Sequence, residues 1–417
     1  MRVTVMTAVL AVSVCILCTP TGAAASLSWR IAADDAVRVV PDGPGPATPV
    51  TSLHLRPCVA GPKTFTVRGP RLSRRIGTSR CTVRVRLPRE ATYRASVARG
   101  RGPVFARARL RPRLLRVVAL GDSFASGEGV PDQRGLYFPQ RDDAGTVVGV
   151  SILRRARWTD ESCHRSSRAV PRLAVASLAN GRTHVTLVHL ACTGAQVNAG
   201  LLSPGGALSS RLLLDGAPQI APDPTAQVSA ARRALRGRRA DAVLLSIGGN
   251  DIGFGDIVAT CATAMSCQDA LAPALGTQLA TLDAALTPLR RALGALAPPR
   301  RVLLVPYPDI VTGPRGAECA ASDLGIEPGE AVWAASAIRA LNSTLRGAAV
   351  RHGWLFADRA ASALAGRGVC AGDAARVVSL SESVVGQGTE TGTLHPDAAG
   401  QRALANTIRG PLGQAVR

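Results

Sequence analysis

A serine and a histidine far apart in the chain stand where they could act on an ester. Ser123 follows the apolar run 116–120 in the sequence Gly-Asp-Ser-Phe, so we expect it just past a strand, where a helix begins. A serine there can be exposed, and the helix N-terminus can hold developing negative charge. His395 precedes Pro396, the favoured first residue of a helix, and so lies on the loop leading into that helix. The two residues suggest a nucleophile with a histidine as general base.

Two further loops carry groups suited to an oxyanion. Gly194, in the sequence ACTGA, follows an apolar run, and a glycine lets the backbone approach a ligand closely. Asn250, in SIGGND, also follows an apolar run and can aim its amide at an oxyanion. Taken singly, each motif also fits an ordinary turn, loop or helix cap. Their combination, in this order, is far more specific than any one of them.

Together the four motifs resemble the blocks of the SGNH (GDSL-like) hydrolases. GDSFASGEG resembles block I, Gly194 the block II glycine, GGND block III and HPDAAG block V, so the resemblance covers roughly residues 113–417. The sequences DESCHRSS, ACTGA and SIGGNDIGF are most similar to the secreted actinobacterial esterase and lipase branch. The resemblance implies that Ser123 attacks the ester, that His395 is its general base, and that an acyl-enzyme forms.

The same resemblance implies an oxyanion hole. Its donors would be the backbone N–H groups of Ser123 and Gly194 and the side-chain amide of Asn250. This chemistry requires no metal and no other cofactor.

The chain departs from the usual family pattern three residues before the histidine, where Gly392 replaces the expected aspartate. In the branch that the chain resembles, a main-chain carbonyl at this position orients the imidazole. We therefore expect the carbonyl of Gly392 to accept a hydrogen bond from the ring of His395 and to fix its tautomer. Glu390, the nearest upstream carboxylate, is the alternative.

The elements that must position these loops alternate between apolar strands and helices. Strands are expected at 116–120, 184–190, 241–247, 301–306 and 353–357, with helices between them. The pattern predicts a three-layer α/β/α domain with a parallel sheet, flavodoxin-like in the family it resembles, over residues 113–417. Ligands bind beyond the carboxyl ends of such strands, where the motifs lie. Residues 131–161 read as an insertion, with a lid or substrate-binding loop as the natural interpretation.

The residues before this domain have a different character. Residues 26–110 contain short alternating runs separated by Gly and Pro, which predicts a small β-rich accessory module whose function is not legible. Residues 1–25 combine Arg2, an apolar run and a final Ala-Ala-Ala, which is typical of a secretory signal peptide. We therefore expect a secreted, extracellular protein, acting as a monomer.

Cysteine usage agrees with export. Eight of the ten cysteines follow residue 25, and an even number outside the cell predicts four disulfides. Proximity within each domain favours the pairs Cys58 with Cys81, Cys163 with Cys192, Cys261 with Cys267, and Cys319 with Cys370. The branch that the chain resembles has three disulfides, consistent with the last three pairs. A zinc site at Cys261 and Cys267 is the rival interpretation, but no Cys-x-x-Cys pair or nearby histidine supports it.

The formal net charge of +22 bears on which kinds of molecule or surface the protein could bind. The basic residues are almost all arginine, with Lys63 the sole lysine, and the aromatic content of 3% leaves few rings for stacking on bases. With no nucleic-acid motif present, the charge favours anionic lipid or cell-wall surfaces over nucleic acid. Three functions stay open: hydrolysis of acyl or lipid esters, phospholipase or acyltransferase action on the same Ser-His pair, and non-catalytic binding to the cell envelope. The intact serine, glycine, asparagine and histidine argue against the last.

Overall fold

The computed structural model describes residues 24–40, 50–88, 90–145, 147–205, 225–261, 266–317, 319 and 324–417. All but the last two residues of the predicted signal peptide lie outside these ranges. The chain divides into two compact units. Unit 1 holds the described residues up to Trp29 together with Ser52–Arg84 and Thr92–Leu110, and unit 2 holds Arg30–Thr51, Val85–Ala91 and Arg111–Arg417.

Antiparallel strands make up most of the N-terminal region, as its alternating sequence predicts. One sheet has the order β5-β4-β7-β8, formed by β4 (Lys63–Gly69), β5 (Leu72–Thr78), β7 (Tyr93–Ala98) and β8 (Val104–Leu110). Another has the order β1-β3-β6, formed by β1 (Ser26–Ile31), β3 (Val50–Arg56) and β6 (Thr82–Arg86). Every second residue of β4 is buried, including Phe65 and Val67, so one face of that strand forms the core.

The second unit is built on a six-stranded sheet of order β15-β14-β13-β9-β12-β2, with every strand parallel to its neighbours. Its members are β2 (Val37–Val40), β9 (Arg113–Gly121), β12 (Thr183–His189), β13 (Ala242–Ser246), β14 (Val302–Leu304) and β15 (Leu355–Phe356). The predicted α/β fold with a parallel sheet is confirmed, and five of its strands are those expected from the sequence.

The edge strand β2 was not expected in this sheet. It lies within the range assigned to the accessory module, yet it pairs with β12, with Val37 opposite Val185. Four residues, VRVV, give too short a pattern to distinguish an edge strand of one sheet from a strand of another. The predicted domain division, with its boundary near residues 110–113, stays a prediction.

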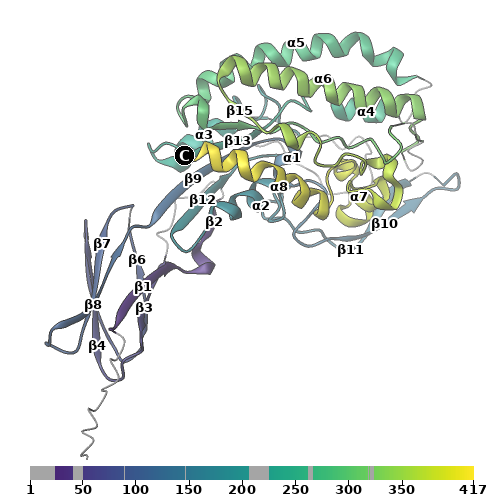
Figure 1. Ribbon diagram of the computed structural model, residues 1–417. Helices are drawn as coiled ribbons and strands as arrows, with labels where there is room; N and C mark the ends of the chain where they lie inside the picture. Colours follow the sequence, from purple (N-terminus) through teal and green to yellow (C-terminus); the bar gives the residue numbers. More distant parts are fainter. Residues whose placement is uncertain are drawn as a thin grey trace, which may run out of the picture. The chain divides into compact units, whose positions relative to one another are not determined.

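Helices cover both faces of the parallel sheet (Figure 1). One face packs against α3 (Gln227–Leu235), α5 (Cys267–Leu293) and α6 (Pro328–His352), and the other against α2 (Val170–Val175) and α8 (Ala398–Ala415). The alternation of β9 explains how one strand serves two cores, because Val118 and Leu120 point into the first and Val117 and Ala119 into the second. In the described part of the chain, no helix has both the length and the apolar character that a membrane span requires.

Shorter elements complete this unit around the ends of the strands. They are α1 (Ser123–Ser126), α4 (Phe254–Cys261), α7 (Leu380–Gln387), η6 (Glu390–Gly392), and the antiparallel pair β10 (Leu136–Arg141) and β11 (Val147–Arg154). The other short 3₁₀ helices are η1 (Ala33–Asp35), η2 (Ala176–Leu178), η3 (Pro299–Arg301), η4 (Asp358–Ala360) and η5 (Val369–Ala374). The insertion expected at 131–161 thus contains a β-hairpin.

Four disulfides lie within the described residues. They join Cys58 to Cys81, Cys163 to Cys192, Cys261 to Cys267 and Cys319 to Cys370, which are the pairs favoured by proximity along the chain.

Candidate active site

The structure brings Ser123 and His395 together although 272 residues separate them. Nε2 of His395 lies 2.7 Å from Oγ of Ser123. Ser123 begins α1 directly after β9, and His395 lies on the loop before α8, as the sequence predicts. The ring of Phe124 lies 4.7 Å, centroid to centroid, from the imidazole and covers part of it.

A tight turn presents Ser123 at the end of β9. Gly121 has φ +145°, and a Cβ there would clash with the carbonyl oxygen of Ser246 on the neighbouring strand. That close approach allows the Asp122 N–H to donate to the same carbonyl at 3.1 Å. The carboxylate of Asp122 then accepts from the Phe124 N–H at 3.1 Å and caps α1. The glycine and aspartate of Gly-Asp-Ser therefore build the turn that presents Ser123.

Asp122 is also tied to a buried tyrosine that the sequence analysis did not single out. The hydroxyl of Tyr307 donates to Asp122 and accepts from the Gly249 N–H at 2.8 Å. Burial raises the pKa of Asp122 to about 7, against the lowering effect of hydrogen bonds from Tyr307 and Phe124. Tyr307 thus connects the loop after β9 to the glycine pair after β13.

The expected oxyanion donors lie on neighbouring loops. Nδ2 of Asn250 donates to the carbonyl of Ala195 at 3.0 Å, so the amide lies beside the loop that contains Gly194. Gly194 has φ +80°, and the next loop residue, Ala195, closes a turn by donating to Cys192 at 3.1 Å. Within the described ranges, the backbone N–H groups of Ser123 and Gly194 donate to no protein acceptor. They are therefore available to a ligand, as is the second N–H of the Asn250 amide.

The ring of His395 is oriented by backbone carbonyls. Nδ1 lies 3.1 Å from the carbonyl oxygen of Thr393, a partner that was not expected. The Gly392 carbonyl, which was expected to orient the ring, accepts from the backbone N–H of His395 at 3.1 Å and also raises the pKa of the ring, so its part in orienting the ring stays a prediction. Leu394, which lies between Thr393 and His395, has φ +61°, a backbone conformation that the sequence pattern does not reveal. With the proton on Nδ1, Nε2 is free to accept from Ser123.

The electrostatic setting keeps His395 neutral. Burial lowers the pKa of the ring, and the charge of Glu128 and the carbonyls of Thr393 and Gly392 oppose that effect without overcoming it. Glu390 contributes its backbone carbonyl to the turn, accepting from the Thr393 N–H at 2.9 Å. A neutral imidazole bonded to a serine hydroxyl can accept its proton.

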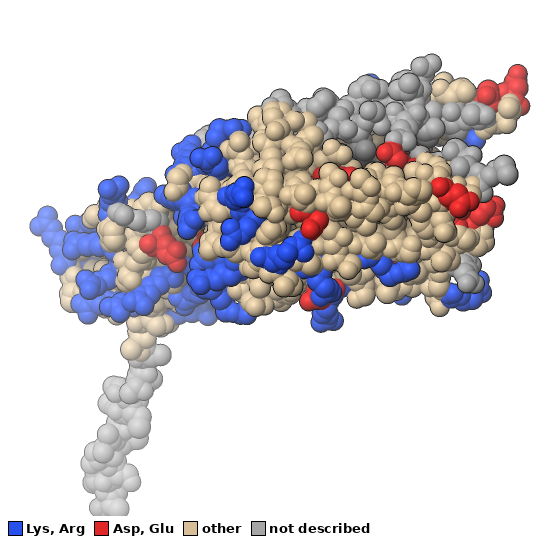
Figure 2. All heavy atoms as spheres, turned by 90° about the horizontal axis from the view of Figure 1, so that it is seen from above, with Lys and Arg blue, Asp and Glu red and all other residues tan. Residues whose placement is uncertain are grey.

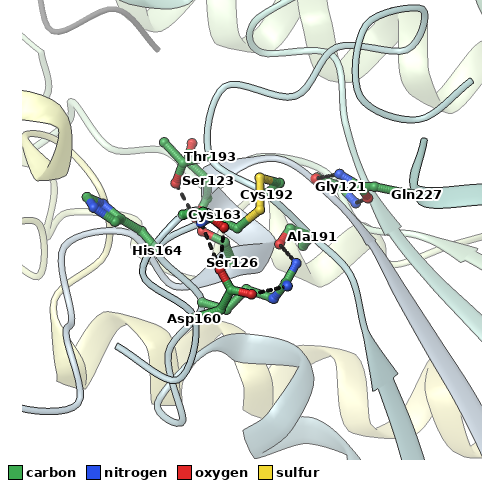
Figure 3. The surroundings of a disulfide bond; sticks show 12 residues. Gly121, Ser123, Ser126, Asp160, Cys163, His164, Ala191, Cys192, Thr193 and Gln227 are labelled. Atoms are coloured by element: carbon green, nitrogen blue, oxygen red, sulfur yellow. Dashed lines mark hydrogen bonds and ion pairs between the residues drawn. A yellow bond between two sulfur atoms is a disulfide. The ribbon is translucent and has the colours of Figure 1, made fainter. Parts of the chain in front are cut away.

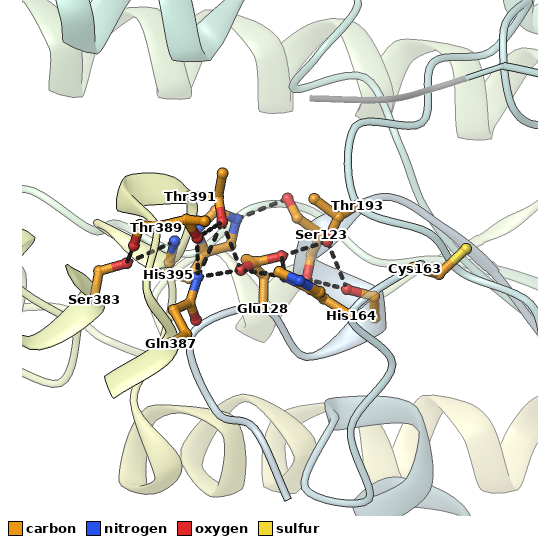
Figure 4. Close-up of polar contacts among 12 residues, drawn as sticks. Ser123, Glu128, Cys163, His164, Thr193, Ser383, Gln387, Thr389, Thr391 and His395 are labelled. Atoms are coloured by element: carbon orange, nitrogen blue, oxygen red, sulfur yellow. Dashed lines mark hydrogen bonds and ion pairs between the residues drawn. The ribbon is translucent and has the colours of Figure 1, made fainter. Parts of the chain in front are cut away.

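Glu128 is the main residue that the sequence analysis missed. Its fully buried carboxylate accepts hydrogen bonds from Nδ1 of His164 at 2.9 Å, Oγ1 of Thr193 at 2.5 Å, Nε2 of Gln387 at 2.6 Å and Oγ1 of Thr391 at 3.0 Å (Figure 4). Burial raises its pKa, but the charge and hydrogen bond of His164, with the charge of His395 and the hydrogen bond from Thr193, lower the pKa to about 2. The only sequence signal was its place in GDSFASGEG.

This carboxylate connects the segments that carry the serine and the histidine. Toward Ser123, Thr193 lies 3.2 Å from Oγ of Ser126, which donates to the Ser123 carbonyl at 3.2 Å. Toward His395, Thr391 and Gln387 belong to η6 and α7, which precede the histidine loop. Hydrogen bonds therefore connect the buried Glu128 to the segments that carry Ser123 and His395.

The disulfide between Cys163 and Cys192 fastens the same region (Figure 3). The carbonyl of Cys163 accepts from the Thr193 N–H at 3.2 Å, so the two bridged loops are also joined by their backbones. Nearby, the amide of Gln227 exchanges two hydrogen bonds with the backbone of Gly121, at 2.8 and 2.9 Å. These contacts hold the serine turn through residues other than those of the histidine loop.

Other polar residues near the site have structural roles. His189 contacts the carbonyl of Ala125 at 2.8 Å, Asp251 accepts from the Val197 N–H at 3.0 Å, and Asp397 caps α8. Among the residues that the structure describes, Cys261, Cys267 and Glu330 have ligand atoms close enough to share a metal, but the two sulfurs are joined in a disulfide and the carboxylate accepts from the Cys267 N–H at 3.1 Å. A bridged sulfur is not the thiolate that zinc binds.

Residues 119–403 match the GDSL-like lipase/acylhydrolase family. The chain belongs to this family. The resemblance seen in the sequence is thus confirmed, and the protein is an esterase or lipase. The matched range contains both Ser123 and His395.

Two relatives and one solved structure that are similar to this chain come from Streptomyces. Lipase 1 of Streptomyces coelicolor is 27% identical over 286 residues, which cover 68% of this chain and 81% of the relative. A lipase of Streptomyces rimosus is 27% identical over 257 residues, covering 61% of this chain and 73% of the relative. Among solved structures, an extracellular lipase from Streptomyces rimosus is 24% identical with a TM-score of 0.48, covering 72% of this chain and 99% of that one.

Proposed function

We propose that this lipase/acylhydrolase is a secreted carboxylic ester hydrolase in which Ser123 and His395 act as a catalytic dyad through an acyl-enzyme. The observation that carries the proposal is the 2.7 Å distance between Nε2 of His395 and Oγ of Ser123, with Nδ1 of the same ring on the carbonyl of Thr393. This arrangement supports a nucleophile, its general base and a group that sets the tautomer of the base.

In the first half-reaction, Oγ of Ser123 attacks the ester carbonyl carbon while Nε2 of His395 takes the hydroxyl proton. The resulting oxyanion would accept hydrogen bonds from the N–H groups of Ser123 and Gly194 and from the amide of Asn250. Collapse of the tetrahedral intermediate breaks the bond to the alcohol oxygen, which receives the proton from His395 and leaves the acyl group on Ser123.

In the second half-reaction, water attacks the acyl-enzyme carbonyl and His395 takes a proton from it. Collapse returns that proton to Ser123 Oγ and releases the carboxylic acid. His395 carries a positive charge while it holds the proton, and the ionised Glu128, whose charge raises the pKa of the ring, favours that state. The carboxylate thus acts at a distance, without the direct bond of a Ser-His-Asp triad.

Lipid-like acyl esters are the substrates we propose. The relatives are named lipases, and one solved relative is described as extracellular. Four disulfides and the expected signal peptide support export. We further propose that residues 26–110 serve as an accessory module to a catalytic domain formed by residues 113–417.

The test uses purified mature protein and p-nitrophenyl esters from acetate to palmitate. Ser123→Ala and His395→Ala should each reduce hydrolysis to background, while Ser73→Ala, an exposed serine of β5, should leave it unchanged. A fluorophosphonate probe should label the wild type and the Ser73 variant but not Ser123→Ala. Hydrolysis that survives Ser123→Ala would refute the proposed mechanism.

A further inference from the structure

The β10–β11 hairpin carries an unusual share of the exposed apolar surface. Six large apolar side chains are exposed in the part of the chain that the structure describes, and three of them belong to this hairpin. They are Phe138, 51% exposed, Val148, 49% exposed, and Leu153, 71% exposed. Scattered apolar side chains are normal on a protein surface, but several on one short hairpin indicate a contact surface.

The hairpin has one face buried and one face outward. Tyr137 and Val150 pack with Ala156 against Val384 of α7. Phe138, the next residue along β10, pairs with Ser151, and Leu153 lies two residues beyond Ser151. Phe138, Ser151 and Leu153 are exposed, whereas Tyr137 and Val150 are buried against α7, so the three exposed side chains face away from that helix; the register shifts between Leu136 and Tyr137, which places Leu153 at a β-bulge. We call Phe138 and Leu153, with Ser151 between them, the outward face.

The hairpin is fixed next to the proposed active site. The Gly135 N–H donates to the carbonyl of Gly386 at 2.7 Å, and Arg134 donates to the carbonyl of Glu382 at 3.3 Å, so its base is bonded to α7. The last residue of α7, Gln387, donates to Glu128, and η6 and the His395 loop follow directly. Figure 1 shows β10 and β11 beside α7. The base of the hairpin is therefore bonded to α7, the helix that leads into η6 and the histidine loop.

The charge around the outward face is positive. Residues 134–157 contain five arginines and two aspartates, and all five arginines are exposed. The arginines are Arg134, Arg141, Arg154, Arg155 and Arg157. Figure 2 shows many basic side chains, with acidic ones among them, on the face that it draws. Apolar side chains surrounded by arginines suit a lipid surface, where the former enter the boundary between headgroups and acyl chains and the latter attract anionic headgroups.

We propose that the outward face of the β10–β11 hairpin docks the protein on lipid surfaces that carry anionic headgroups, so that the enzyme takes its ester substrate from that surface. The uptake of substrate from the surface rests on the proposed function, whereas docking itself does not. A polysaccharide would also offer contacts to arginine, but it gains less from the apolar side chains than an acyl layer does.

Docking is tested without catalysis, on a Ser123→Ala background. Sedimentation with vesicles of phosphatidylcholine containing one quarter phosphatidylglycerol should pull down this protein, and the further changes Phe138→Ser and Leu153→Ser should lower its partition at least tenfold. The matched control is Val332→Ser with Val350→Ser, two exposed valines of α6. Arg155→Gln with Arg157→Gln should abolish the preference for anionic vesicles. Equal partition of the hairpin and control variants would overturn docking, and equal binding of the starting protein to pure phosphatidylcholine would overturn its anionic preference.

Activity is then compared on two substrates, with Ser123 restored. The Phe138 and Leu153 double variant should hydrolyse soluble p-nitrophenyl acetate within twofold of wild type, and p-nitrophenyl palmitate held in the anionic vesicles at least tenfold more slowly. Unchanged melting temperatures exclude misfolding. If wild type hydrolyses neither ester, the proposed function fails while the sedimentation result still decides docking. If the double variant hydrolyses the vesicle substrate like wild type, the hairpin is not the route to the substrate.

Discussion

Nδ1 of His164 lies 2.9 Å from Oε2 of Glu128, and the two side chains are only 5% and 0% exposed. Trp158 stacks on the same imidazole, with ring centroids 4.3 Å apart. A charged carboxylate is stable in such a place only when it is fully hydrogen bonded, and Glu128 meets that condition with donors from four segments. Its pKa of about 2 means that it stays ionised across the pH range in which an esterase works.

Replacing Glu128 with glutamine should therefore change both stability and the pH profile. A neutral amide presents N–H groups where the donors of His164 and Gln387 now point, so we expect a loss of roughly 1 to 3 kcal/mol of unfolding free energy. The charge of Glu128 raises the pKa of His395, so its removal should shift the acid limb of kcat/KM to lower pH.

The control for this change is Asp143→Asn, an exposed carboxylate on the segment between β10 and β11. Its pH profile and its urea unfolding midpoint should match those of the wild type. An acid limb that stays in place in Glu128→Gln, or that moves to higher pH, would contradict electrostatic support of His395.

Asn250→Ala tests the oxyanion donors. The amide already lies beside the Gly194 loop, where it donates to Ala195 at 3.0 Å, so its loss should act mainly on the transition state. Removal of one such donor typically costs about 10²- to 10³-fold in kcat. Steady-state kinetics on a short p-nitrophenyl ester should show this fall with little change in KM. Asn198→Ala, an exposed amide in the segment after Gly194, should have no effect, and a similar fall there would point to a general disturbance of the loop.

The positions of Ser123, Gly194, Asn250 and His395 could be predicted because each follows a strand or precedes a helix whose apolar pattern is strong. Parallel strands bring their carboxyl ends to one edge of a sheet, so three of the four loops must converge there. The strand β2 escaped prediction because its partner, β12, is 143 residues or more away along the chain and its own pattern is only four residues long.

The supporting contacts could not be predicted, because they depend on the path of single loops. The carbonyl that faces the imidazole depends on the backbone of residues 392–395. Leu394 has a positive φ there, a conformation that leucine rarely adopts. The role of Glu128 depends on donors from α7 and η6, more than 250 residues later in the chain. The sequence accordingly gives no indication that His164 contacts this carboxylate.

Removal of the Cys163–Cys192 disulfide should impair activity as well as stability. His164 and Thr193 directly follow the two cysteines, and both donate to Glu128. The double change to serine should cost on the order of 2 to 5 kcal/mol and lower kcat. The comparison is with Cys58→Ser and Cys81→Ser, whose bridge lies in the N-terminal β region. This control variant should lose stability and keep its kcat on soluble esters. Equal losses of kcat in both double variants would contradict a link between the Cys163–Cys192 disulfide and the site.

Asp122 predicts a pH-dependent stability of a definite sign. Its pKa is about 7 in the folded protein, against an ordinary value of 3.8, so between about pH 4 and pH 7 the folded state holds a proton that the unfolded state has lost. Stability from this group is fully present below pH 4 and is lost as the pH rises through 7, with a slope of at most about 1.4 kcal/mol per pH unit. Asp251, with a pKa raised by burial to about 6, acts in the same direction.

Asp122→Asn removes this titration and isolates it from that of other groups. His189, whose pKa is lowered by burial to about 4, makes stability rise with pH over part of the same range, so the absolute curve of the wild type mixes opposite trends. Urea unfolding of both proteins at several pH values from 4 to 8 gives the difference between them, in which the shared groups cancel. The unfolding free energy of the wild type should fall relative to that of the variant as the pH rises toward 7. A difference that is constant with pH would mean that Asp122 is ionised in the folded protein and that its contact with Tyr307 is a charged one.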